Sequence, residues 1–202
     1  GYRNQSVSES SGPGIPNYLN APVLGPTGDW AYIPSKQDNI LAGAARGNPG
    51  ITFDQTVRAV TSRVNLATGS ENPGTRIDHD NASVATGAVV TADGRYLFVA
   101  LETSREVAVY NLEDGYQLTR LSAGLAPQGL ALSADGERLL IHNFMDRSLQ
   151  SIDLAPILLD NLPQANDLHT VALVSSEHLL PEVLVGKQLF YDAADDRLAR
   201  DS

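Results

Sequence analysis

The 202-residue chain is 42% hydrophobic and 19% charged, a composition that suits one globular domain or slightly more and excludes disorder of the whole chain. Its net charge of −10 argues against nucleic acid and anionic membranes as partners. The lack of cysteine excludes disulfides, thiolate metal sites and thiol catalysis by these residues. Because no apolar run reaches the roughly 18 residues of a membrane helix, we expect no membrane span.

The first 16 residues are rich in Ser, Gly and Pro and hold few apolar side chains. Such a segment buries too little surface to offset its ordering entropy, so we expect residues 1–16 to be a flexible lead-in. The chain starts at Gly1, without a Met or a secretory signal pattern. We therefore interpret it as a piece of a longer or processed protein.

From residue 17 to 175 the chain shows short alternating apolar runs bounded by Gly-containing turns, the pattern of β-strands. Three segments, 22–33, 88–99 and 130–141, share one template of apolar run, turn ending in Gly, and second apolar run. The turn glycines Gly94 and Gly136 are 42 positions apart. A third strand follows each of them and ends in an amide or acid before Leu.

This repeat predicts an all-β fold of β-propeller blades over residues 17–175, because a unit of this length accommodates four short antiparallel strands. Three blades form an incomplete ring, since propellers typically have about four to eight. We expect the rest of the ring to come from sequence outside this chain or from a partner chain. The aromatic residues at matched second-strand positions are expected to be core between blades: Trp30, Tyr32, Tyr96 and Phe98.

The first unit carries an insertion, approximately Lys36 to Thr56, between its second and third strands. Long loops in compact domains are often functional, so one interpretation is partner docking or a lid over a neighbouring domain. The other is a surface segment that packs against the next blade.

Polar residues in two loop regions suggest a metal or small-ligand site. Asp78, His79 and Asp80 fall in or just after the fourth strand of the first unit, and His142 is placed in the loop between the second and third strands of the last unit. Loops of these two classes open on the same propeller face, so a metal site of Asp78, His79, Asp80 and His142 is geometrically feasible. The alternative is that these residues cap strands and face water.

The pattern changes again after residue 175. Residues 181–191 place Val183, Gly186 and Phe190 on one helical face, with Val185 and Leu189 beside it. The propeller repeat does not explain these apolar positions. We therefore predict a helix that starts a second domain, residues 176–202.

Two motifs resemble known families. The blade template with Ser-Ala-Asp-Gly at 133–136 resembles the YVTN-type propellers of secreted and surface bacterial proteins. Residues 185–192 (VGKQLFYD) and 197–202 (RLARDS) resemble the stretch before the first Cys-x-x-Cys-His haem motif of the di-haem cytochrome c peroxidases and their MauG-like relatives. The resemblance implies haem c in a continuation of the sequence, with four residues packing near it without being ligands: Lys187, Leu189, Phe190 and Tyr191.

Two functional hypotheses follow. In the first, the chain is the scaffold and docking part of an exported c-type cytochrome, periplasmic or on the bacterial cell surface. Its partners would be the remaining propeller and haem domain, and a redox protein. In the second, it is a non-enzymatic propeller module that binds a surface protein without a cofactor. No catalytic residue is assigned, because nucleophile-elbow, phosphate-loop and dinucleotide motifs are missing, so we expect this chain alone not to be an enzyme.

Overall fold

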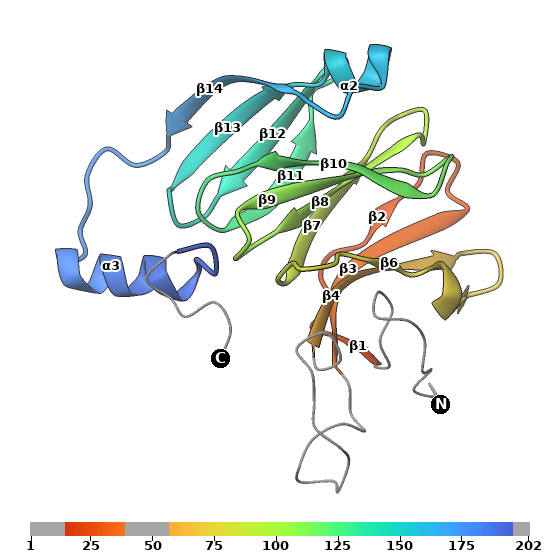
Figure 1. The fold of residues 1–202 in the computed structure, drawn as a ribbon, viewed down its shortest axis with the longest axis horizontal. Coiled ribbons are helices and arrows are strands. Elements are labelled where there is room, and N and C mark those ends of the chain that lie inside the picture. The colour runs from red at the N-terminus through yellow and green to blue at the C-terminus, as the bar shows by residue number, and fades with distance from the viewer. Residues whose placement is uncertain (1–14, 39–56, 196–202) are drawn as a thin grey trace, which may run out of the picture.

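The computed structural model describes residues 15–38 and 57–195, which form three antiparallel sheets arranged as neighbouring blades (Figure 1). The expected all-β fold of propeller blades is confirmed. Most of the expected lead-in and of the insertion lies outside the described residues. Their described parts are strand: Ile15 and Pro16 belong to β1, and residues 36–38 belong to β3.

The first blade has interrupted inner and outer strands. Its long central pair, β3 and β4, is in register from Trp30 opposite Asn65 to Asp38 opposite Val57. Strands β1 and β2 both pair with β3, and β5 and β6 both pair with β4, with the 3₁₀-helix η3 between them. The elements are β1 (Ile15–Asn17), β2 (Val23–Leu24), β3 (Trp30–Asp38), β4 (Val57–Asn65), β5 (Ser70–Glu71), η3 (Pro73–Thr75) and β6 (Ile77–Asp78).

The second and third blades each have four strands in simple up-and-down order. The second blade consists of β7 (Ala85–Val90), β8 (Tyr96–Leu101), β9 (Glu106–Asn111) and β10 (Tyr116–Ser122). The third consists of β11 (Pro127–Leu132), β12 (Arg138–Asn143), β13 (Ser148–Asp153) and β14 (Asn166–Ala172), with helix α2 (Ala155–Asp160) before β14. Helix α3 (Pro181–Phe190) follows, so the helix expected from residue 181 is confirmed.

The first hairpin of every blade turns at a glycine with positive φ: Gly28 at +74°, Gly94 at +75° and Gly136 at +76°. An L-residue is strained in this conformation. Beside Gly94, the Asp93 carboxylate accepts a hydrogen bond from the backbone N–H of Arg95 (3.0 Å). The turn at Gly136 makes the equivalent bonds, which confirms the sequence repeat.

The amide or acid that ends each third strand caps the turn that follows it. The side-chain oxygen of Asn65 accepts the N–H of Thr68 (3.0 Å), and that of Asp153 accepts the N–H of Ala155 (3.0 Å). Asn111 accepts two successive N–H groups. The repeated polar residue therefore satisfies backbone donors that would otherwise be unpaired.

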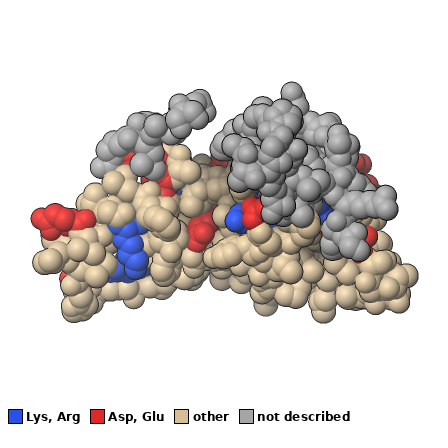
Figure 2. Space-filling view, turned by 90° about the horizontal axis from the view of Figure 1, so that it is seen from below, with Lys and Arg blue, Asp and Glu red and all other residues tan. Residues whose placement is uncertain are grey.

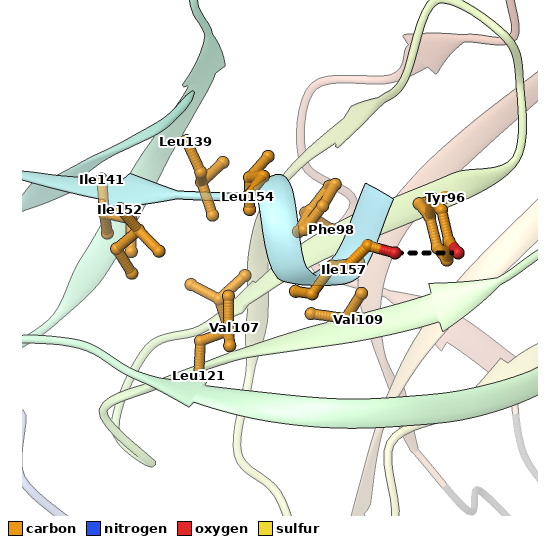
Figure 3. Close-up of a cluster of buried hydrophobic side chains, with 10 residues drawn as sticks. All are labelled: Tyr96, Phe98, Val107, Val109, Leu121, Leu139, Ile141, Ile152, Leu154 and Ile157. Atoms are coloured by element: carbon orange, nitrogen blue, oxygen red, sulfur yellow. Dashed lines mark hydrogen bonds between the residues drawn. The ribbon is translucent and has the colours of Figure 1, made fainter. Parts of the chain in front are cut away.

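Two clusters of buried apolar side chains fill the spaces between blades. One joins the first blade to the second and includes Tyr32 and Leu97. The other joins the second blade to the third around α2, where the Tyr96 hydroxyl donates to the Ile157 carbonyl (3.2 Å). Figure 3 shows its members: Tyr96, Phe98, Val107, Val109, Leu121, Leu139, Ile141, Ile152, Leu154 and Ile157. The middle blade is thus buried on both faces, and all of β8 is inaccessible.

The inner strands approach closely where the second and third blades meet. A Cβ atom added to Gly87 on β7 would lie 2.4 Å from the carbonyl oxygen of Gln128 on β11. Beside it, the Thr86 hydroxyl donates to the carbonyl of Pro127 (2.9 Å). Only glycine allows this separation of the two backbones.

The outer face of the third blade has no neighbouring blade among the described residues. Leu140 lies four positions after its turn glycine, as do Tyr32 and Phe98 in the first two blades. Tyr32 and Phe98 are buried against the next blade, whereas Leu140 is half-buried, and Val171 on the outer strand of the same sheet is 50% exposed. By the repeat, this face is equivalent to the faces of the first two blades that pack against the next blade.

Candidate functional site

Helix α3 is attached to the propeller by the residues just after its last turn. The Tyr191 ring packs edge-on against Phe144 in the β12–β13 loop, with 5.7 Å between centroids. Asp192 is 6% exposed and lies 3.5 Å from the Arg105 guanidinium, and the Ala193 N–H donates to the Thr103 carbonyl (2.9 Å). The helix is therefore placed beneath the second and third blades (Figure 1).

A cavity of about 340 Å³ lies where the third blade meets α3. We call it the α3 cavity. It is formed by β12 and the loop after it, the segment after β14, and α3. Its walls are His142, Phe144, Met145, Arg147, Leu173, Val174 and Lys187. A mostly apolar cavity with a few polar groups is the usual form of a small-molecule site.

The two permanent cations of the α3 cavity differ in their partners. Arg147 forms an ion pair with Glu177. Lys187 Nζ lies 5.5 Å from the centroid of the Phe144 ring, and no carboxylate of the described residues is within ion-pairing distance of it. Figure 2 shows Lys and Arg surface surrounded by uncharged atoms toward the end of the molecule that holds α3. The cavity therefore carries one uncompensated positive charge.

The structure does not bring the four expected metal ligands together. The guanidinium of Arg58 donates to Asp78 at 2.7 and 2.6 Å and to Asp80 at 2.9 Å. Among the described residues, no group of three or more His, Asp or Glu side chains is placed to hold a metal ion. His142 is a residue of β12, not of the loop after it, and the whole middle blade separates it from the other three.

His79 is a buried packing residue between the first two blades. Its ring is 1% exposed, its Nε2 is 2.8 Å from the Thr61 hydroxyl, and it stands edge-on to Tyr110 at 5.4 Å. Burial lowers the pKa of His79 to about 3, helped by the charge of Arg120. Burial also raises the pKa of Tyr110 to about 12. Both rings are therefore neutral at neutral pH.

The four residues expected to pack near a haem lie at the C-terminal end of α3 and just after it. Leu189 and Tyr191 are half-buried, Lys187 is exposed, and Phe190 is 80% exposed. One of them, Lys187, lines the α3 cavity with His142, a residue of the expected metal site. The structure thus joins residues from two separate sequence hypotheses in one cavity.

Other residues of the cavity had no assigned role in the sequence. Phe144 and Met145 stand in the hairpin loop of the third blade, where polar turn residues are usual. Met145 is 3% exposed. An apolar pair in a hairpin loop is the sequence signal that could have indicated this cavity. The sequence does not show that Leu173 and Val174 complete the cavity, because they are far from this loop in the chain.

No protein-family model and no curated protein matches this sequence. Hydrazine synthase from Kuenenia stuttgartiensis aligns at 16% identity and a TM-score of 0.59 over 68% of this chain and 46% of its own. The WD40 repeats of RRP9 align at 15% identity and a TM-score of 0.52 over 76% and 38% of the two chains. The periplasmic gluconolactonase PpgL from Pseudomonas aeruginosa aligns at 16% identity and a TM-score of 0.50 over 78% of this chain and 55% of its own. The chain covers about half of these proteins or less, and the likeness establishes that its fold is that of a β-propeller.

Proposed function

We propose that the chain is the propeller part of an exported c-type cytochrome that resembles the di-haem peroxidases, with YVTN-type blades that orient a haem domain starting at α3. The exposed apolar surface of α3 carries the proposal. Val183 is 52% exposed, Val185 44% and Phe190 80%. Val183 and Phe190 are seven positions apart and so lie on the same side of the helix. Adjoining exposed apolar side chains mark a contact surface, and the described blades do not cover them.

The chain suits a position beside a haem but not its attachment. Its 202 residues contain no cysteine, so the Cys-x-x-Cys-His motif of a c-type haem has to belong to another segment. Lys187, Leu189, Phe190 and Tyr191 offer a cation and an apolar, aromatic surface for packing. The haem, when bound, supplies the redox chemistry. The propeller residues hold α3 in place through Phe144, Thr103 and Arg105.

Under this proposal the protein is periplasmic or on the surface of a bacterial cell, with the remaining blades, the haem domain and a redox protein as partners. None of the helices in residues 15–38 and 57–195 is long and apolar enough to cross a membrane.

Haem staining of the intact gene product, together with Phe190→Ala, tests the proposal. We expect covalently bound haem. Under the proposal the haem domain buries Phe190. We therefore expect Phe190→Ala to destabilise the haem domain by roughly 3–5 kcal/mol, the cost of truncating a buried Phe, and to shift the optical spectrum of the haem. The strand signal in circular dichroism should stay the same. The control is Leu159→Ala, which truncates an 81% exposed residue on α2. Absence of haem, or loss of the strand signal in Phe190→Ala, contradicts the proposal.

The second candidate function is a non-enzymatic binding module for a surface protein. The observation in its favour is that Leu173 and Val174, which line the α3 cavity, are 55% and 43% exposed and so offer an apolar face to a partner. An intact protein without haem that still binds a partner through this face would establish this function instead.

A further inference from the structure

We propose that the α3 cavity binds a small amphipathic anion, an aromatic or short aliphatic monocarboxylate. Lys187 also belongs to the haem proposal, but the site needs no haem, because every group that it uses is in the described chain. Its recognition would combine an apolar pocket for the body of the ligand with a cation for the carboxylate.

The apolar part of the site comes from two segments of the third blade. Phe144 and Met145 lie in the β12–β13 loop, and Leu173 and Val174 follow β14. Leu173 is 55% and Val174 43% exposed. A body that fills the cavity would cover this surface and gain the free energy of apolar burial. The volume of about 340 Å³ is at the lower end of the range for small-molecule cavities, which begins at about 300 Å³.

The sign of the ligand charge follows from the cations. Glu177 already neutralises Arg147. The Lys187 ammonium has no counter-charge in the cavity, and a neutral ligand would not supply one. Lys187 belongs to α3, a helix of ten residues, and is exposed. A carboxylate at the cavity mouth would complete an ion pair there. A cationic ligand would be repelled by Lys187 and would have no free carboxylate among the lining residues.

His142 supplies the second polar contact. It is half-buried on β12 opposite Gly129 and Leu149, lines the cavity, and makes no hydrogen bond to a residue that the structure describes. A ring N–H of His142 would donate to the second carboxylate oxygen. Two donors on different elements fix the orientation of one carboxylate, whereas a single surface lysine does not fix it.

The test uses a charged probe and its neutral analogue on the intact protein. We expect 2-naphthoate to bind in calorimetry and 2-naphthalenemethanol to bind more weakly. Lys187→Gln should weaken 2-naphthoate about tenfold, the loss of one charge-assisted contact, and leave 2-naphthalenemethanol unchanged. Lys36→Gln is the matched control, because Lys36 is already paired with Asp38 (3.2 Å) in the first blade. It should bind both probes as the wild type does.

Two further measurements locate the probe. After reductive ¹³C-methylation of lysines, the signal that disappears in Lys187→Gln should shift on titration with 2-naphthoate, and the signal of Lys36 should not. Leu173→Trp, checked for an unchanged circular dichroism spectrum, should fill the cavity and block both probes. Equal affinity for both probes in the wild type, no effect of Lys187→Gln, or undiminished binding to Leu173→Trp would overturn the proposal.

Discussion

At the scale of single residues, the packing between the first two blades depends on a histidine that has to stay neutral. His79 is enclosed by Thr61, Tyr110 and the backbone of β4, and its Nδ1 has no hydrogen-bond partner in the structure. Protonation of this ring would place a charge in an apolar space near the guanidinium of Arg120. The cost of such burial couples the stability of this interface to pH.

The pKa of His79 is about 3 in the folded chain, against 6.5 for an unperturbed histidine. Below pH 6.5 the unfolded chain therefore binds a proton that the folded chain does not. The free energy of unfolding should fall as pH decreases from 6.5 toward 3, by roughly 1.4 kcal/mol per pH unit at most. Urea unfolding between pH 7 and 4 measures this slope.

The slope should be smaller in His79→Gln, because glutamine does not titrate at this buried position. His169→Gln is the control, since His169 is exposed on β14, and it should keep the wild-type slope. Identical slopes in the wild type and His79→Gln would show that this ring does not control the response.

At the scale of elements, the short distance between the inner strands β7 and β11 depends on Gly87. Gly87→Ala puts a methyl group against the Gln128 carbonyl, and backbone on both sides prevents easy relief. We expect a loss of about 2–3 kcal/mol in the free energy of unfolding. Gly136→Ala is the comparison, because its φ is positive but no atom lies within 4 Å of the added carbon. It should cost about 1 kcal/mol.

Chemical denaturation of both variants measures these losses. If Gly87→Ala is no worse than Gly136→Ala, then β7 and β11 are not held at this distance in solution. A larger loss in Gly136→Ala than in Gly87→Ala would show that the hairpin turn, and not the contact between the inner strands, constrains the blade geometry.

At the scale of the whole molecule, the outer face of the third blade is an apolar surface without a neighbouring blade among the described residues. Leu140 on this face is half-buried, and Val171 in the same sheet is 50% exposed. A twofold contact buries the same patch on both copies, so two copies of this chain would associate through their third blades.

We expect the 202-residue chain to self-associate with increasing concentration, as measured by light scattering after size-exclusion chromatography. Leu140→Lys should reduce this association and leave the circular dichroism spectrum unchanged, because it adds charge to the third-blade face. Leu159→Lys, at an exposed position of α2, should associate like the wild type. A monomer at every concentration, or equal effects of both variants, would contradict this role of the face.

The repeat was predictable from sequence because its determinants are local. A turn glycine, the Asp before it and the amide or acid ending the third strand all act within a few residues. The pairing of Arg58 with Asp78 was not, since the two are 20 positions apart and meet only when β6 pairs with β4. The α3 cavity has the same origin. Its walls come from segments that are distant in sequence, and no periodic pattern indicates which loops will meet.

The unprotected outer strand of the third blade creates a gradient of local unfolding across the molecule. Every residue of β14 is exposed, whereas every residue of β8 is buried. Amide protons of β14 should therefore exchange with solvent through small fraying motions, and those of β8 only through global opening. In a longer propeller, a neighbouring blade would slow exchange in the third blade, so its protection would report directly on ring completion.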